Sequence, residues 1–176
     1  MGYSTLMRLA RFAVLLIVQL VILNHLHLFG YATPLLIGYM IICFETGTSR
    51  MSLLLWGFAI GIIYDIFSNT IGIAASSCTL LAMIQPYLVK LYMPRDINES
   101  FKPTIQTLGI QKYTWYVLSM MGVLHFVFYF LQAFTMADIW LTIGAMFGGT
   151  LLSSILVVCV EFILHYLNNE DEKVKI

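Results

Sequence analysis

Residues 57–69 read Gly57-Phe-Ala-Ile-Gly61-Ile-Ile-Tyr-Asp65-Ile-Phe-Ser-Asn69, an apolar run with two glycines and one carboxylate. Positions four residues apart share a helix face, so Gly57, Gly61 and Asp65 would lie together. Two glycines at this spacing let a second helix approach closely. A carboxylate within hydrocarbon costs about 2.5–3.5 kcal/mol, so the presence of Asp65 in this apolar run requires a structural or functional explanation. Two interpretations are open: a buried carboxylate that fixes a helix junction or lines a pocket, or an interfacial one that caps the turn 68–72.

The composition around this run is that of a membrane protein. The 176 residues are 60% hydrophobic and 10% charged, with a mean hydropathy of +0.89, whereas soluble domains have about 25% charged residues. Six apolar stretches predict an all-α polytopic membrane protein, a single six-span helical bundle. The second would cover only about 21 Å as a helix, so the second and third could be two short spans or one re-entrant hairpin. The stretches run over residues 12–29, 31–44, 51–67, 72–93, 114–134 and 139–167.

The positions of the basic residues predict the orientation. If all six stretches cross and the N-terminus starts in the cytoplasm, all nine Lys and Arg residues face the cytoplasm, as the positive-inside rule favours. Both termini, the loop 94–112 and the tail 168–176 would then be cytoplasmic. A four-span alternative, with a re-entrant hairpin over 31–67, misplaces only Arg50. The basic residues are Arg8, Arg11, Arg50, Lys90, Arg95, Lys102, Lys112, Lys173 and Lys175.

Other polar residues within the stretches have mainly structural interpretations. Glu161 lies in the last stretch with His165 four residues on, a spacing that permits a hydrogen-bonded pair, but snorkelling of Glu161 to the interface is the favoured interpretation. Glutamines 19, 85 and 132 predict interhelical hydrogen bonds. Gly144 and Gly148 form a second small-residue face, for which packing within the chain is the favoured interpretation.

The sequence gives little support for catalysis. Ser76, Ser77 and His125 are present, but no motif of a serine nucleophile surrounds them. The spacing of the histidines and cysteines does not suit a zinc site. We therefore expect no enzyme activity, no metal and no cofactor.

Several segments resemble one known family. The opening from Gln19 to Pro34, the run from Gly57 to Ser77 followed by Gln85-Pro86, and the loop with Arg95-Asp96 and Glu99-Ser-Phe-Lys-Pro103 are similar to the rod shape-determining MreD family, in particular its Bacteroidetes-type members. The likeness covers nearly the whole chain. Glu45-Thr-Gly-Thr48 departs from it, since a proline is expected there. The residues expected on a helix-packing, partner or pocket face, all but Gly57 matched to the family motif, are Asn24, Pro34, Gly57, Gly61, Asp65 and Gly72.

The resemblance implies a non-enzymatic scaffold subunit of the bacterial rod complex, or elongasome, in the inner membrane. Members of the family work with the bitopic protein MreC, with MreB and RodA, and with a class B penicillin-binding transpeptidase, to support lateral peptidoglycan synthesis and rod shape. The partners expected are these proteins and membrane lipid, with no nucleic acid. The family fold is similar to the substrate-binding subunits of energy-coupling-factor transporters. The alternative function is therefore a substrate-binding membrane subunit of a vitamin-type transporter, with a small solute held beside Asp65.

Overall fold

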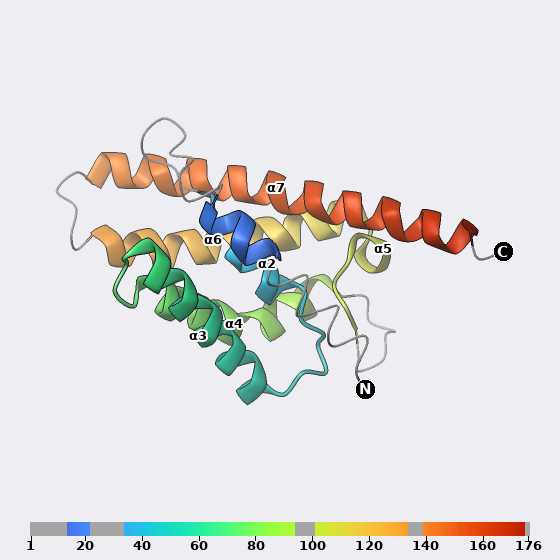
Figure 1. Ribbon diagram of the computed structural model, residues 1–176, viewed down its shortest axis with the longest axis horizontal. Helices are drawn as coiled ribbons and strands as arrows, with labels where there is room; N and C mark the ends of the chain where they lie inside the picture. Colours follow the sequence, from blue (N-terminus) through green and yellow to red (C-terminus); the bar gives the residue numbers. More distant parts are fainter. Residues whose placement is uncertain (1–13, 22–33, 94–100, 134–138, 175–176) are drawn as a thin grey trace.

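The computed structural model describes residues 14–21, 34–93, 101–133 and 139–174, and every regular element in these ranges is a helix (Figure 1). This confirms the predicted all-α class for the described part of the chain. Residues 14–21 form the first helical segment. The elements that follow are α2 (Ile37–Ile42), α3 (Arg50–Ser68), α4 (Ile73–Tyr92), α5 (Ile105–Leu108), α6 (Ile110–Ala133) and α7 (Ile139–Val174).

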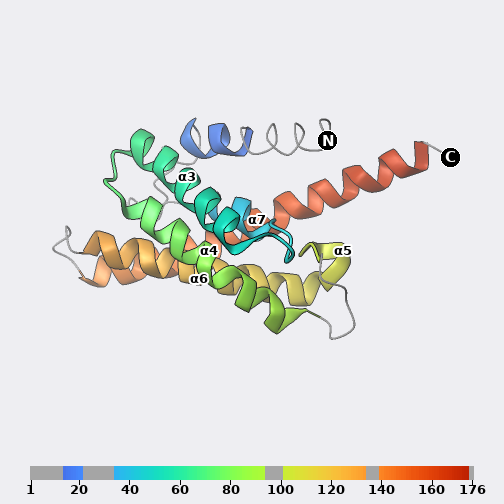
Figure 2. The ribbon, with the colours of Figure 1, turned by 90° about the horizontal axis from the view of Figure 1, so that it is seen from below.

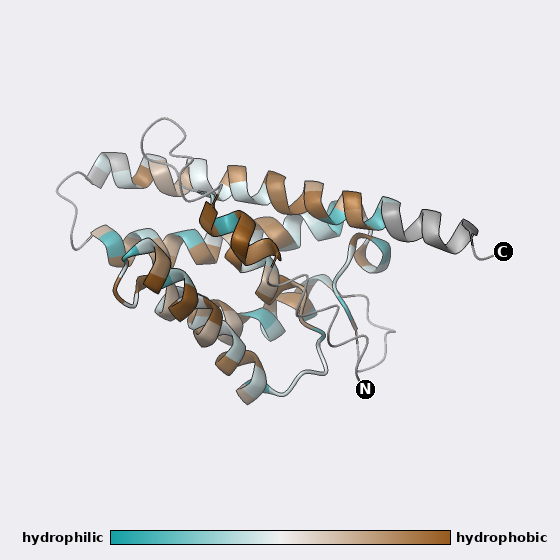
Figure 3. Cartoon of the chain, viewed as in Figure 1, coloured by the Kyte–Doolittle hydropathy of each residue, from teal (hydrophilic) through white to brown (hydrophobic). Residues whose placement is uncertain are grey.

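Four of the described helices are long and apolar enough to cross a membrane. The candidate spans are Arg50–Ser68, Ile73–Tyr92, Ile110–Ala133 and Thr142–Tyr166. Large hydrophobic side chains on their outer faces are exposed, for example Leu55 at 66% and Phe147 at 62%, and apolar positions recur along α3 and α7 (Figure 3). A bundle with an apolar exterior is stable only where lipid covers it. The chain is therefore a helical membrane protein.

The observed helices differ from the predicted spans at several boundaries. The predicted stretch 31–44 contains α2, only six residues long and about 9 Å in length. The predicted stretch 51–67 forms α3 with 19 residues, long enough to cross alone. A short helix that the hydropathy did not predict, α5, interrupts the loop 94–112. At the chain's end, α7 continues through most of the segment predicted as a tail, because helical hydrogen bonding extends beyond the apolar part. The six-span count remains a prediction.

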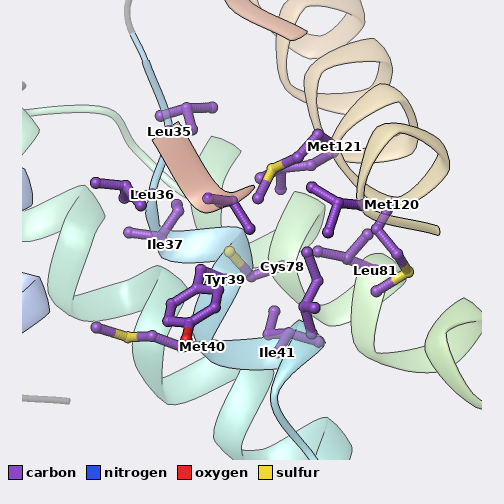
Figure 4. Close-up of a cluster of buried hydrophobic side chains, with 14 of the residues drawn as sticks. Leu35, Leu36, Ile37, Tyr39, Met40, Ile41, Cys78, Leu81, Met120 and Met121 are labelled. Carbon is purple, nitrogen blue, oxygen red and sulfur yellow. The ribbon is translucent and has the colours of Figure 1, made fainter. Parts of the chain in front are cut away.

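The short helix α2 lies in the centre of the core. All residues from Leu35 to Ile42 are buried, and α2 contacts α3, α4 and α6. Figure 4 shows its side chains meeting Cys78 and Leu81 of α4, and Met120 and Met121 of α6. A helix buried on all sides needs apolar residues all round, which the sequence Ile-Gly-Tyr-Met-Ile-Ile supplies.

Glutamine side chains from two other helices satisfy backbone groups at the two ends of α2. Gln19 donates from Nε2 to the carbonyl of Pro34 (3.0 Å) and accepts from the amide of Leu36 (2.6 Å). At the other end, Gln85 donates to the carbonyl of Phe44 (3.2 Å). Irregular backbone at membrane depth is tolerated only where protein groups satisfy it. These bonds confirm the predicted interhelical roles of Gln19 and Gln85.

The described Lys and Arg residues gather at one end of the bundle, which we call the basic end. The α3–α4 turn, the end of α6 and the start of α7 lie at one end, and α5 and the end of α7 lie at the other (Figures 1 and 2). At the α5 end are Arg50 in the first turn of α3, Lys90 in the last turn of α4, and Lys102 and Lys112 on either side of α5. This separation agrees with the predicted orientation, in which this end faces the cytoplasm.

Candidate functional site

Two glycines of α3 set the distance between α3 and α4. A Cβ on Gly61 would lie 2.4 Å from Cα of Ala75 and 2.6 Å from the carbonyl oxygen of Ala74, and one on Gly57 would lie 2.8 Å from Cβ of Ala82. Such distances leave no room for a methyl group, so the backbones touch. The face formed by the glycines at i and i+4 therefore packs against α4, a helix of the same chain.

Asp65 continues this face and caps the N-terminus of α4. Its Oδ1 accepts from the amide of Ala74 (3.0 Å) and the hydroxyl of Thr70 (2.6 Å), and Oδ2 accepts from the amide of Ala75 (2.9 Å). The side chain is 8% exposed. The first amides of a helix have no partner within it, and they carry the positive end of the helix dipole, so a carboxylate is the favoured cap. Asp65 is therefore the buried carboxylate that fixes a helix junction, not an interfacial one, and its bond to Thr70 also holds the turn.

The turn between α3 and α4 depends on two left-handed residues. Asn69 ends α3 with φ 54°, and Gly72 precedes α4 with φ 76°. Gly72 adopts this conformation without the steric cost that a Cβ would add. Gly57, Gly61, Asp65 and Gly72 are therefore brought together at one helix junction.

Of the two remaining predicted site residues, the structure describes one. Pro34 is buried before α2, where its carbonyl accepts the bond from Gln19 described above. Asn24 lies outside the described residues.

His125, which stood isolated in the sequence, pairs with a serine in the core. Ser153 of α7 bonds to Nε2 of His125 (3.3 Å) and accepts from the amide of Leu35 (2.9 Å), while Nδ1 of His125 bonds to the carbonyl of Met121 (2.9 Å). His125 and Ser153 are both fully buried. Because no substrate reaches a sealed pair, this chain of bonds serves to anchor the start of α2. Ser76 and Ser77 instead donate to backbone carbonyls of their own helix.

Glu161 of α7 is buried, which contradicts the snorkelling interpretation. It is 8% exposed, and its Oε2 accepts a 2.5 Å hydrogen bond from the hydroxyl of Tyr39 in α2. His165, at the spacing that suggested a pair with Glu161, bonds through Nδ1 to Nε2 of Gln106 (2.8 Å) in α5. Packing of α2 and α5 against α7 therefore covers a position that hydropathy alone placed near the interface.

A cavity of about 300 Å³ opens beside Glu161 at the basic end of the bundle. Exposed residues such as Lys102 and Gln106 line it together with the buried Tyr39 and Glu161, so it reaches from the surface into the bundle. Its volume lies at the lower limit for small-molecule sites, about 300 Å³. The full lining is Leu15, Tyr39, Met40, Cys43, Phe44, Glu45, Thr48, Lys102, Thr104, Ile105, Gln106, Glu161, Leu164 and His165.

Two loops are tied together to form the wall of this cavity. The amide of Thr46 donates to the carbonyl of Phe101 (2.9 Å), and the amide of Phe101 donates to the hydroxyl of Thr46 (2.9 Å). Thr104 then caps α5 by accepting from the amide of Thr107. This arrangement fixes α5 beside α7, where Gln106 reaches His165.

Sequence reasoning missed this cavity, although one signal was present. Glu161 is an acidic residue within an apolar stretch, and such residues mark functional positions by default. The contribution of Tyr39 and of α5 had no sequence signal, because both come from segments more than 50 residues away.

Gly144 does not show the close helix packing that its spacing from Gly148 predicted. Within the described residues, nothing lies within 4 Å of a Cβ built at Gly144.

Comparison with family models, with curated proteins and with solved structures found no match to this chain.

Proposed function

We propose that the chain is a non-enzymatic scaffold subunit of the bacterial rod complex, similar in role to the MreD family that its sequence resembles. In this proposal it crosses the inner membrane six times with both termini in the cytoplasm, in a bundle similar to energy-coupling-factor substrate-binding subunits. It binds a bitopic MreC-type protein and works with MreB, RodA and a class B transpeptidase to support lateral peptidoglycan synthesis and rod cell shape.

The observation that carries the proposal is the α3–α4 junction. Three motif positions, Gly61, Asp65 and Gly72, all act within the fold: the first permits close packing, the second caps α4, and the third permits the turn. Residues that serve chemistry usually leave a reactive group facing a cleft. Because these motif residues serve helix packing, they support a scaffold role, in which the protein presents a rigid surface to its partners.

The same observation argues against the transporter alternative. That alternative requires Asp65 to hold a solute, but both of its carboxylate oxygens already accept hydrogen bonds from Thr70 and the N-terminus of α4. A solute would have to displace these bonds and leave buried amides unpaired, which costs about 1–3 kcal/mol for each group.

Capture of the tagged full chain from solubilised membranes, together with depletion in rod-shaped cells, tests the proposal. We expect the bitopic partner to co-purify and the depleted cells to become round. Gly144→Ala serves as a control for tagging and expression, because no described atom approaches that position. If depleted cells keep their rod shape and the bitopic partner is not recovered above the level of untagged controls, the scaffold role is refuted. A small solute that co-purifies and is lost in Asp65→Asn would favour the transporter.

A further inference from the structure

Among the described residues, Glu161 has fewer hydrogen-bond partners than a buried carboxylate can accept. An ionised carboxylate offers about four acceptor sites, and within the described residues Tyr39 is the hydrogen-bond partner found for Glu161. Burial of a charge costs several kcal/mol unless an opposite charge and further hydrogen bonds compensate it. Among the described residues, Glu161 therefore keeps acceptor capacity for a hydrogen-bond donor such as an ammonium group.

The cavity beside Glu161 suits a small ammonium group. A primary ammonium has three N–H donors, which match the acceptors that a carboxylate presents. Tyr39 and Phe44 are aromatic residues of the same lining, and aromatic rings attract cations within about 6 Å. Leu15, Met40 and Leu164 add apolar contacts for the carbon atoms that carry such a group.

Groups nearer the surface suit a phosphate. Lys102 supplies a positive charge, and Thr48 and Gln106 supply hydrogen-bond donors in the same lining. Lysine binds phosphate as a point charge. The cavity therefore combines two carboxylates, the buried Glu161 and the half-buried Glu45, with the exposed cation Lys102. This arrangement suits a zwitterion that enters with its ammonium first.

We propose that this cavity binds a phosphoethanolamine group, with the primary ammonium on Glu161 and the phosphate beside Lys102. Two sources carry this chemistry: the headgroup of a phospholipid and a soluble glycerophosphoethanolamine. The cavity lies at the basic end of the bundle, where the headgroups of a surrounding bilayer would lie. The site does not rest on the scaffold function, since its binding is measured on the purified chain alone.

Native mass spectrometry of the delipidated full-length chain in detergent tests the proposal. The probes are phosphatidylethanolamine, phosphatidylcholine and phosphatidylglycerol with identical acyl chains, and glycerophosphoethanolamine. Phosphatidylcholine keeps the phosphate but has no N–H donor, and phosphatidylglycerol has no ammonium. We expect phosphatidylethanolamine to bind about tenfold more tightly than the other two lipids. If glycerophosphoethanolamine binds equally well, the soluble compound is the source; if only the diacyl form binds, the lipid is.

Variants assign the preference to the cavity. Glu161→Gln should abolish the preference for phosphatidylethanolamine, whereas Phe162→Leu, at the neighbouring exposed position, should retain it. Lys102→Gln, at an exposed position, should weaken the binding of all three lipids about equally. Equal binding of the three headgroups by the wild type, or an unchanged preference in Glu161→Gln, would overturn the proposal. Thermal unfolding of each variant, measured beside the wild type, verifies that the binding data come from folded protein.

Discussion

Asp65 and Glu161 are the two carboxylates that the described part of the bundle buries, each 8% exposed, and their surroundings differ. Asp65 accepts three hydrogen bonds from its own chain, all within ten residues. Glu161 accepts one from Tyr39, 122 residues away, and borders a cavity. Equal burial therefore accompanies different roles: Asp65 is fully used in the helix junction, whereas Glu161 has one hydrogen-bond partner among the described residues and borders the proposed ligand site.

Replacement of Asp65 by alanine should have the largest effect on stability. The amides of Ala74 and Ala75 and the hydroxyl of Thr70 would lose their acceptor within a buried junction. Unsatisfied buried groups and a lost charged cap together cost about 3–5 kcal/mol. Denaturant titration in detergent micelles measures this loss. A loss below about 1 kcal/mol would show that the cap contributes little.

A methyl group on Gly61 should have the next largest effect. The new Cβ would collide with backbone atoms of Ala74 and Ala75, which cannot rotate away as a side chain can. Forced separation of packed elements costs about 1–3 kcal/mol. Gly144→Ala is the matched control in α7, and it should be neutral or stabilise by up to about 1 kcal/mol through helix propensity. Equal effects of the two substitutions would contradict close α3–α4 packing.

Ser153→Ala should have an effect no larger than that of Gly61→Ala, at the start of α2. The amide of Leu35 would lose its acceptor and Nε2 of His125 its hydroxyl partner. One buried unsatisfied group costs about 1–3 kcal/mol. Thr150→Val provides a control on the same helix, since the hydroxyl of Thr150 donates to the carbonyl of Met146 within that helix. If Thr150→Val destabilises as much as Ser153→Ala, the bond to Leu35 has no special role.

The α3–α4 junction was largely predictable because its signal is local. Gly57, Gly61 and Asp65 lie at a four-residue spacing within one helix, and helical geometry alone puts them on one face. The sequence could not show which helix packs there, since small-residue faces look alike: Gly61 meets a neighbour, whereas Gly144 does not. Only the packed structure distinguishes them.

The cavity was not predictable, for a physical reason. Burial of Glu161 depends on the placement of Tyr39 and α5, which come from distant segments with no shared periodicity. The interruption of the predicted stretch 31–44 was hidden for a similar reason. Its backbone ends are satisfied by Gln19, Gln85 and Ser153, and each belongs to another helix.

The contrast between the two carboxylates is tested most directly by their neutral isosteres, Asp65→Asn and Glu161→Gln, compared in one denaturant titration of the full chain in micelles. We expect Asp65→Asn to lose about 2 kcal/mol, because its amide nitrogen cannot accept from a backbone amide of α4. We expect Glu161→Gln to stay within about 0.5 kcal/mol of the wild type or to gain stability, because it keeps an acceptor for Tyr39 and removes a buried charge. A loss in Glu161→Gln equal to or greater than that in Asp65→Asn would contradict the account.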